Sequence, residues 1–529
     1  MSTACFGNVP LTSKYDHSII FSSRDEQTTY FARKLTSSVF TDLTFVRRGT
    51  PLQLKRDGVA SEALAWNYAK ISNGGDPSPR YYFVTAVRYI NENTVEVDLE
   101  LDVVQTYLFD AELLPCLIER QHTVTDEIGE HTVDEGLETG ELVNLWQSDA
   151  DELTELGILF LSSVWITMKD SAYTFADTLN GTSYDGIFSG LKAYMCEGSA
   201  RMCEYFGSML NQMGNKIDGI SAIWVYPRQL IEIRDDAVNV APCAEPVKAS
   251  ATISKTIAKR QEIDGYTPRN NKLLTYPYTF LAITNNAGGQ AIYRYERFAS
   301  DLCEFVIKGA ISPDAGARIE PKFYNGTGDN YEAGLTLGSF PSCAWDADPY
   351  KIWLASNHNQ NTTEHNVNAG KIAAGLGILT ATVVTGGGAA ALAAGGGMLA
   401  SGVMGAASQI AQHKDMDTQP AQARGMHSTS INAAHGKQTF SFYAKSINAE
   451  HARRIDDFFT MYGYKLNKID APNRAARPTF TYVKTSGCKV AGAIQHSDAV
   501  RLEAIYDNGI TFWAPTAKLG DYTQANAPR

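Results

Sequence analysis

The stretch YYFVTAVRYINENTVEVDLELDVVQTYLF, residues 81–109, carries the pattern that decides the fold class. It begins with a run from Tyr81 to Ile90 that is rich in β-branched and aromatic residues, and the turn residues Asn91-Glu92-Asn93 follow. Apolar and acidic residues then alternate from Val95 to Asp102. Alternation with a period of two places the two kinds of side chain on opposite faces of a strand. The stretch therefore predicts a β-hairpin with one face on a core.

The acidic face of the second predicted strand is a row of four carboxylates. Its members are Glu96, Asp98, Glu100 and Asp102. A row of this kind is usually a solvated surface, but it also suits the lining of a channel. The alternation alone leaves both interpretations open.

Other segments extend the β pattern and add helices. The run 153–168 is compatible with a strand or with a buried helix, because a short apolar run has no decisive period. Apolar residues at helical spacing predict one helix within 199–216 and another over 449–462. The aromatic stretch 273–298 predicts strands around a turn at 285–289. The predicted fold class is therefore mainly β with a few helices.

A second hairpin is predicted near the C-terminus. The segment VRLEAIYDNGITFWAP, residues 500–515, contains Asp507-Asn508-Gly509 between two apolar runs. Asn-Gly is the strongest short signal for a tight β-turn. We therefore expect one strand on each side of this turn.

Length and charge limit the possible functions. The 529 residues suffice for roughly two to four domains, and 26 Tyr with 22 Phe favour β-structure, where flat rings pack well. A formal net charge of −12 argues against a protein that grips nucleic acid by neutralising phosphates. The same charge is compatible with a surface past which nucleic acid slides.

Cysteines, histidines and glycines form no motif of a catalytic or metal site. The eight cysteines include no CxxC pair, so we expect buried thiols in a protein made in a reducing cytosol. The chain has no H-E-x-x-H, G-x-S-x-G or P-loop motif. The N-terminus lacks a basic region followed by an apolar core. We predict no enzyme, no cofactor, no metal and no secretory signal.

The most unusual feature is an apolar segment, residues 372–411, that has no charged side chain. Its large apolar residues are Ile372, Leu376, Ile378, Leu379, Val383, Val384, Leu392, Met398, Leu399, Val403, Met404 and Ile410. Two membrane-spanning helices need about 40 residues, so a two-pass hairpin is one alternative. Glycine triplets at 386–388 and 395–397 weaken helices, however, and no aromatic residue anchors the ends. A loop buried inside a large complex is another alternative.

A nucleotide-binding loop is a weaker interpretation of the same segment. Gly386, Gly388 and Ala391 follow a β-branched run and imitate the dinucleotide fingerprint. That site needs a second strand ending in Asp or Glu about twenty residues further on. The residues that follow here do not resemble a strand, so we do not expect a nucleotide.

Eight stretches stand in order along almost the whole chain and together resemble one family. They are LKRDGVASEALAWNYAKISN (54–73), RYYFVTAVRYINENTVEVDLELDVVQTYLFD (80–110), LIERQHTVTD (117–126), TPRNNKLLTYPYTFLAI (267–283), YRYERF (293–298), FPSCAWDADPYKIWLASNHNQ (340–360), RRIDDFFTMYGYKLNKIDAPNRAARPTFTYVKTSGCKVAG (453–492) and IYDNGITFW (505–513). The ordered set resembles the distal tail tube, or tail knob, proteins of short-tailed, phi29-like bacteriophages.

The resemblance implies a structural virion protein. It implies hexameric rings of tail-tube-like β-barrels, a knob domain, and a long apolar loop that plugs the lumen until contact with the host. The loops then insert into the host cell membrane and form a pore through which double-stranded DNA passes without specific binding. Other phage tail proteins are the implied partners. The implied location is the tail tip of the virion, after assembly in the bacterial cytoplasm.

This resemblance also gives expected boundaries and a role for the acidic row. We expect a tube region at 1–140, a middle or knob domain at 141–355, a membrane-active loop and linker at 356–430, and a segment at 431–529 that returns to the tube. At least some of the four carboxylates are expected to face the lumen. The alternative is a constitutive integral membrane protein in which the apolar segment is a two-pass hairpin.

Overall fold

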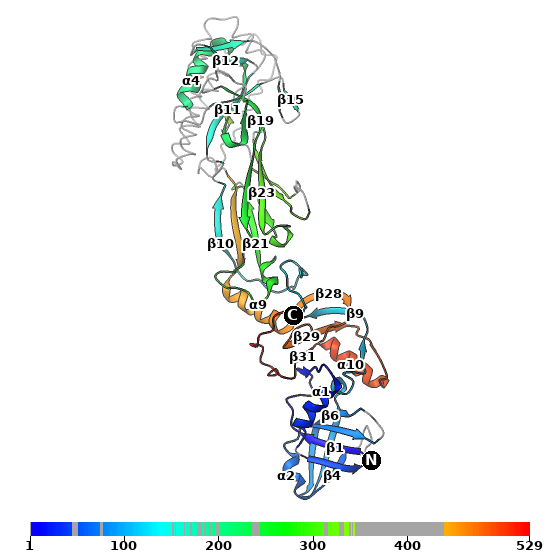
Figure 1. The fold of residues 1–529 in the computed structure, drawn as a ribbon. Coiled ribbons are helices and arrows are strands. Elements are labelled where there is room, and N and C mark those ends of the chain that lie inside the picture. Colours follow the sequence, from blue (N-terminus) through cyan, green and yellow to red (C-terminus); the bar gives the residue numbers. More distant parts are fainter. Residues whose placement is uncertain are drawn as a thin grey trace, which may run out of the picture. The chain divides into compact units, whose positions relative to one another are not determined.

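In the computed structural model, the chain forms two compact units, which are drawn in Figure 1. The structure describes residues 2–343 and 439–528, apart from gaps at 37, 45–50, 75–77, 151–152, 154, 163, 170–171, 177–181, 185–186, 190–191, 197–201, 235–243, 287, 312–315, 327–332, 338–339 and 341. The first unit comprises Met1–Gly140, Gly265–Thr275 and Asn448–Arg529. The second comprises Glu141–Asp264 and Tyr276–Ile447.

These units differ from the expected parts in two places. The segment Gly265–Thr275, expected within the middle part, lies in the first unit. Strand β27 (Ser441–Ile447), expected to return to the tube, lies in the second unit because it pairs with two strands there. The return to the first unit therefore begins at Asn448.

The N-terminal part of the first unit is an antiparallel sheet in the order β3-β1-β5-β6-β7-β4. Its strands are β1 (Ser2–Gly7), β3 (Ser38–Leu43), β4 (Leu52–Lys55), β5 (Tyr68–Asn73), β6 (Arg80–Asn91) and β7 (Thr94–Leu101). Phe40 of β3 and Leu54 of β4 belong to one core cluster although these are the two edge strands. The sheet therefore curls around its core, as Figure 1 shows.

The hairpin predicted from the alternating stretch is confirmed. Strands β6 and β7 pair with each other, and Glu92-Asn93 forms the turn between them. Val95 and Val97 are fully buried, whereas Glu96 and Asp98 point away from that core. The period of two thus separates a core face from an acidic face, as a half-buried strand requires.

A second sheet of the first unit joins the two ends of the chain, in the order β2-β31-β29-β9-β28. Its strands are β2 (Ser18–Ile19), β9 (Cys116–Gln121), β28 (Tyr464–Asp470), β29 (Phe480–Ser486) and β31 (Ile510–Trp513), and β8 (Glu112–Leu113) pairs separately with β30 (Val490–Ala491). The helices of this unit are α1 (Arg24–Lys34), α2 (Val59–Ala63), α3 (Val103–Thr106), the 3-10 turn η4 (Asn271–Leu274), α9 (Ala449–Tyr462) and α10 (His496–Asn508).

One predicted element is wrong, and one is confirmed to the residue. The predicted strand before Asp507 is helix α10, which ends at Asn508. Asp498, Leu502 and Tyr506 are its buried residues, so the buried face recurs every four residues as in a helix. Gly509, with φ +93°, lies where the helix ends and β31 begins, so the Asn-Gly pair marks a helix end instead of a hairpin. Helix α9 spans the predicted residues.

The core of the first unit draws on both ends of the chain. Tyr68, Tyr81 and Phe83 of the N-terminal sheet share one cluster with residues of the C-terminal segment. The C-terminal members are Val483, Cys488, Leu502, Tyr506, Ile510 and Phe512. Burial of such large side chains contributes roughly 2 kcal/mol each, so neither end of this unit has a complete core without the other.

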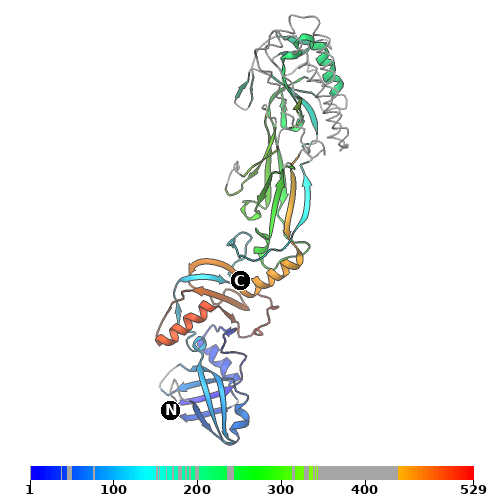
Figure 2. The ribbon, with the colours of Figure 1, turned by 180° about the vertical axis from the view of Figure 1, so that it is seen from behind.

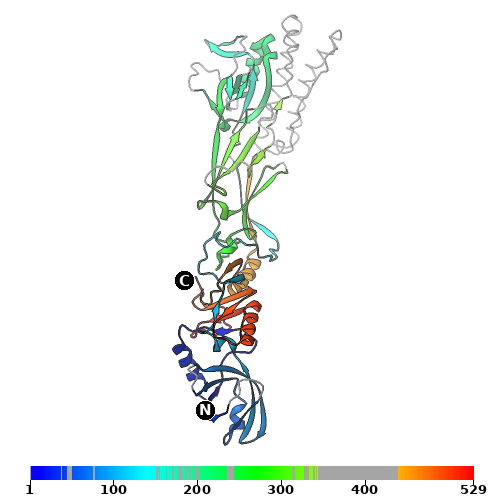
Figure 3. The ribbon, with the colours of Figure 1, turned by 90° about the vertical axis from the view of Figure 1, so that its right-hand side faces the viewer.

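The described residues of the second unit form three larger sheets and two short hairpins, which Figures 2 and 3 show from other sides. One sheet has the order β10-β27-β21-β22, with β10 (Leu142–Asp149), β21 (Thr279–Thr284) and β22 (Gln290–Tyr293). Another is β18-β19-β16-β11-β17-β26, with β11 (Leu156–Ser162), β16 (Lys192–Cys196), β17 (Ile220–Pro227), β18 (Ile231–Ile233), β19 (Glu245–Ser250) and β26 (Ser342–Cys343). The third is β20-β23-β24-β25, with β20 (Thr252–Ala258), β23 (Leu302–Gly309), β24 (Ala317–Lys322) and β25 (Leu335–Leu337). The remaining elements are β12 (Trp165–Lys169), β13 (Ala172–Ala176), β14 (Thr182–Tyr184), β15 (Ile187–Ser189), α4 (Met202–Met213), η2 (Gly214–Gly219), η3 (Arg228–Leu230) and η5 (Tyr295–Arg297).

All three larger sheets of the second unit contribute to one hydrophobic cluster. Phe442 of β27 lies 5.9 Å from Phe305 of β23, measured between ring centroids, and Trp224 of β17 belongs to the same cluster. The ambiguous run 153–168 contains strand β11, whose residues are all buried, and most of strand β12. The predicted helix within 199–216 is confirmed as α4, and the predicted hairpin around 285–289 as β21–β22. The fold class is mainly β with a few helices, as predicted.

Candidate functional site

The predicted membrane-active segment lies outside the described residues. Ile372, Leu376, Ile378, Leu379, Val383, Val384, Leu392, Met398, Leu399, Val403, Met404 and Ile410 all belong to it. The described chain leaves off after β26 and resumes just before β27, and both strands belong to the second unit. Among the described helices, none has the length and apolar character that crossing a bilayer requires. The role of this segment stays a prediction.

Three of the four predicted acidic residues project from β7 and are paired with arginines. Arg88 on the neighbouring strand β6 places its two terminal nitrogens 2.7 Å from Glu96 and 2.6 Å from Asp98. Glu100 pairs with Arg501 of helix α10. The side chains of Glu96 and Asp98 are 25% and 29% exposed. This face is therefore a mixed surface of acids and arginines, and its place in the lumen wall stays a prediction.

Asp102 does not belong to this exposed row. Strand β7 ends at Leu101, and Asp102 is the N-cap of helix α3, with its side chain only 2% exposed. One carboxylate oxygen accepts from the backbone N–H of Gln105 at 3.0 Å and the other from the Tyr68 hydroxyl at 2.7 Å. Burial raises the pKa of Asp102 to about 6. Its side chain faces the interior of the unit, so the expectation of lumen lining is corrected for this residue.

A buried carboxylate on helix α9 holds the segment 265–275, and sequence reasoning did not identify it. Asp456 is fully buried. Its oxygens accept from the Tyr266 hydroxyl at 2.5 Å, the Arg269 backbone N–H at 2.8 Å, and the backbone and side-chain N–H groups of Asn270 at 3.1 and 2.7 Å. These donors satisfy both oxygens of the buried carboxylate within the fold. Asp456 therefore fixes residues 266–270 in the first unit.

Two more acids hold the next residues of the same segment. Asp126 accepts from the backbone N–H of Asn271 at 3.1 Å and from the Tyr464 hydroxyl at 2.6 Å. Glu135, whose side chain is fully buried, pairs with Lys272 and with Arg120. Burial is the main effect on Lys272 and lowers its pKa. We refer to Asp126, Glu135 and Asp456 together as the acid clamp.

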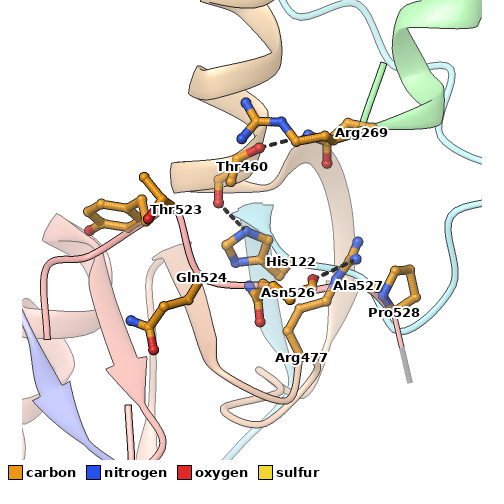
Figure 4. A pocket seen from close by; sticks show the side chains of 12 residues that line it. His122, Arg269, Thr460, Arg477, Thr523, Gln524, Asn526, Ala527 and Pro528 are labelled. Atoms are coloured by element: carbon orange, nitrogen blue, oxygen red, sulfur yellow. Dashed lines mark hydrogen bonds between the residues drawn. The ribbon is translucent and has the colours of Figure 1, made fainter. Parts of the chain in front are cut away.

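A pocket of about 320 Å³ lies beside the acid clamp, wholly within the first unit (Figure 4). Its lining residues are His122, Arg269, Asn270, Thr460, Arg477, Tyr522, Thr523, Gln524, Ala525, Asn526, Ala527 and Pro528. The tail 522–528 forms one wall, because the Asn526 side chain accepts from the backbone N–H groups of Thr479 and Phe480 at 3.0 and 3.1 Å. The pocket thus has a fixed wall built from the last residues of the described chain.

His122 in this pocket is a neutral structural residue. Its Nδ1 accepts from the Tyr482 backbone N–H at 2.8 Å, and its Nε2 lies 3.0 Å from the Thr460 carbonyl, to which it donates (Figure 4). Burial lowers the pKa of His122 to about 3. Both ring nitrogens are in use, so this imidazole is no candidate for proton transfer at neutral pH.

Arg477 has a different environment. Its side chain is 6% exposed, its Nη1 donates to the Asn526 carbonyl at 3.3 Å, and its Nε is buried without a hydrogen-bond partner. Burial lowers the pKa of Arg477, and Asp126 opposes that effect electrostatically. Within the part of the chain that the structure describes, no group of three or more His, Cys, Asp or Glu side chains is arranged to hold a metal ion.

Comparisons with known proteins place this architecture among tail proteins of tailed bacteriophages. Residues 2–112 match the N-terminal domain of caudoviral major tail proteins, and residues 244–527 match the C-terminal domain of the tail knob protein gp9 of Bacillus phage phi29. The second match covers more than half of the chain. The chain belongs to the tail knob protein family of phi29-like phages, and it is therefore a structural component of the phage tail.

Relatives match along the full length. The tail knob protein gp9 of Bacillus phage phi29 is 24% identical, and that of Bacillus phage B103 is 23% identical. Each comparison covers 99% of this chain and 98% of the relative. The solved structure of the bacteriophage C1 tail knob protein, gp12, has the same fold, with a TM-score of 0.62 at 15% identity over 99% of this chain and 98% of that one. The predicted resemblance is confirmed.

Proposed function

We propose that six copies of this chain form a ring at the distal end of the tail, and that the apolar segment of each copy closes the channel until it inserts into the host cell membrane. The observation that carries this proposal is the uncharged stretch 372–411 in a chain that aligns end to end with tail knob proteins. Its sequence suits temporary membrane contact, since it is uncharged throughout, mostly apolar, and rich in glycine.

Insertion of this segment into a bilayer requires several copies of the chain. An unpaired backbone N–H or C=O group in hydrocarbon costs several kcal/mol, and glycine triplets weaken any helix that would satisfy those groups. Segments from neighbouring subunits can satisfy each other only if they close into a ring. Cyclic symmetry supplies such a ring without a free edge.

Strand β27, which follows the segment in sequence, is firmly held in the second unit. This strand lies between β10 and β21 and pairs with both, and Phe442 is fully buried in the cluster of the second unit. Release of the apolar segment would therefore leave the supporting sheet intact. We infer that the second unit acts as the frame from which the segment is displaced.

The charge of the chain fits passage of DNA. Double-stranded DNA carries one negative charge for roughly each 1.7 Å of its axis, so a basic bore would bind it at every step. The net charge of −12 in each copy opposes such binding. We propose that Glu96, Asp98 and Glu100 contribute to the lumen wall, where Arg88 and Arg501 prevent excessive repulsion between neighbouring acids.

Replacement of residues 372–411 by a glycine–serine linker of equal length tests the proposal. We expect native mass spectrometry and negative-stain images to show the same hexameric ring, while leakage of dye from anionic liposomes is lost. A linker variant that still permeabilises liposomes would disprove the membrane role. A wild-type protein that stays in solution only with detergent would favour the integral membrane protein instead.

A double substitution that keeps the length of the segment tests whether its apolar character is required for leakage. Val383→Asp with Val384→Asp places two charges in the segment, each of which costs about 3 kcal/mol at the centre of a bilayer. We expect strongly reduced leakage from this variant. Val383→Ile with Val384→Ile is the matched control and should leak like the wild type, whereas equal activity of all three proteins would contradict insertion of this part.

A further inference from the structure

Arg477 is a buried cation in the wall of the pocket. Among the residues that the structure describes, none forms an ion pair with its guanidinium group, and its Nε has no hydrogen-bond partner. A buried charge is normally paired, because an unpaired one loses its hydration without compensation. The hydrogen bond from Nη1 to the Asn526 carbonyl is long, at 3.3 Å, and Nε lies buried beside it without a hydrogen bond.

The other charges around the pocket already have partners. Arg269 pairs with Asp457 and lies 3.5 Å from Asp456. Asp456 accepts several further donors, and Asp126 is occupied by Tyr464 and Asn271. Each of these acids is held by its own donors, so none is free to turn toward Arg477. The unsatisfied group at the pocket wall is therefore a cation.

We propose that this pocket binds one carboxylate group, which forms a paired hydrogen bond with the Arg477 guanidinium. The planar fork of an arginine matches the two oxygens of a carboxylate. The nearby acids Asp126, Asp456 and Asp457 favour a ligand with a single negative charge over a doubly charged phosphate. The volume of about 320 Å³ leaves room for a side chain or a small organic acid behind the carboxylate.

The experiment compares acetate, a blocked peptide (N-acetyl-Gly-Glu-Gly amide) and inorganic phosphate on the full chain. Isothermal titration calorimetry and thermal melting are carried out at constant ionic strength, with chloride as the reference salt. We expect acetate to bind and raise the melting temperature, and phosphate to have a smaller effect. If the peptide also binds, an acidic side chain of another protein can fill the site; if only acetate binds, the ligand is a free acid.

Three variants assign the effect to Arg477. Arg477→Gln removes the charge and should weaken acetate binding at least about tenfold, as expected for hydrogen bonds between charged groups. Arg477→Lys keeps the charge but not the planar fork, so its affinity should be intermediate. Arg454→Gln is the control, because Arg454 is an exposed residue of helix α9 that pairs with Glu450.

The stability of the ligand-free variant separates binding from folding. Removal of an unpaired buried charge should not lower the melting temperature, so Arg477→Gln is expected to fold. An equal response of wild type and Arg477→Gln to acetate would overturn the proposal. A response of the wild type that is the same in acetate, phosphate and chloride would overturn it as well.

Discussion

The first unit uses acidic residues in two contrasting settings. On β7, Glu96 and Asp98 are partly exposed and pair with the exposed Arg88. In the acid clamp, Glu135 and Asp456 are fully buried and hold a segment that enters the unit from a distant part of the sequence. Water competes for the hydrogen bonds of the exposed acids on β7 but not for those of the buried acids in the clamp. The same residue type is therefore expected to contribute little at one place and to be indispensable at the other.

The largest effect is expected at Glu135. Glu135→Ala leaves Lys272, 5% exposed, and Arg120 without their shared partner. Breaking a buried pair in this way costs about 3–5 kcal/mol. Hydrogen exchange with mass spectrometry should show strongly faster exchange in residues 265–275. The double variant Glu135→Ala with Lys272→Met should regain much of the protection from exchange. If Glu135→Ala alone exchanges as slowly as the wild type, the role of the acid clamp is contradicted.

Asp456 and its neighbour Asp457 form a matched pair for the next test. Asp456→Ala removes the acceptor of Tyr266, Arg269 and Asn270 and should lower the unfolding free energy of the first unit by about 2–4 kcal/mol. Asp457→Ala removes only an exposed pair with Arg269 and should cost less than about 1 kcal/mol. Denaturation followed by hydrogen exchange measures both. Equal effects would show that burial does not determine the contribution.

Asp102 should make stability depend on pH. Its pKa in the folded protein, about 6, lies above the ordinary value of an aspartic acid, 3.8, so the folded state binds the proton more tightly. The stability from this group is complete below pH 4 and is lost as the pH rises through about 6, by roughly 3 kcal/mol at most. Asp102→Asn should remove this loss between pH 4 and 7. If the melting temperatures of both proteins change equally with pH across that range, Asp102 is not the source of the pH dependence.

The smallest effect is expected at Arg88. Arg88→Ala breaks two partly exposed ion pairs, and the loss of stability should be small and should shrink further in high salt. Melting temperatures at low and high ionic strength provide the measurement. A large, salt-independent loss would show that the acidic face of β7 is organised like the acid clamp, and would remove the contrast between the two regions.

Local patterns predicted much of the fold because they depend on nearby residues. Alternation in β7 and the apolar spacing of α9 each reflect one buried face of one element. The C-terminal helix α10 shows where such reasoning fails. Its Asn-Gly pair is a strong turn signal, yet its buried positions follow helical spacing because the helix packs against β29 and the N-terminal part of the unit.

The site residues show the same division. Glu96, Asp98 and Glu100 were visible in the sequence because they alternate with buried residues, whereas Asp102 continued the pattern in sequence but not in space. No local sequence pattern marked the residues of the acid clamp or Arg477. Asp456 meets Asn270 across 186 positions and Glu135 meets Lys272 across 137.

The sequence by itself determined the fold class, the family and the existence of an uncharged segment, because composition, period and ordered motifs are properties of the chain alone. Only the tertiary structure decided which acids are buried, how the chain divides into units, and that the Nε of Arg477 is buried without a hydrogen bond to any described residue. The physical reason is that burial and charge pairing depend on neighbours that the chain brings together only when it folds.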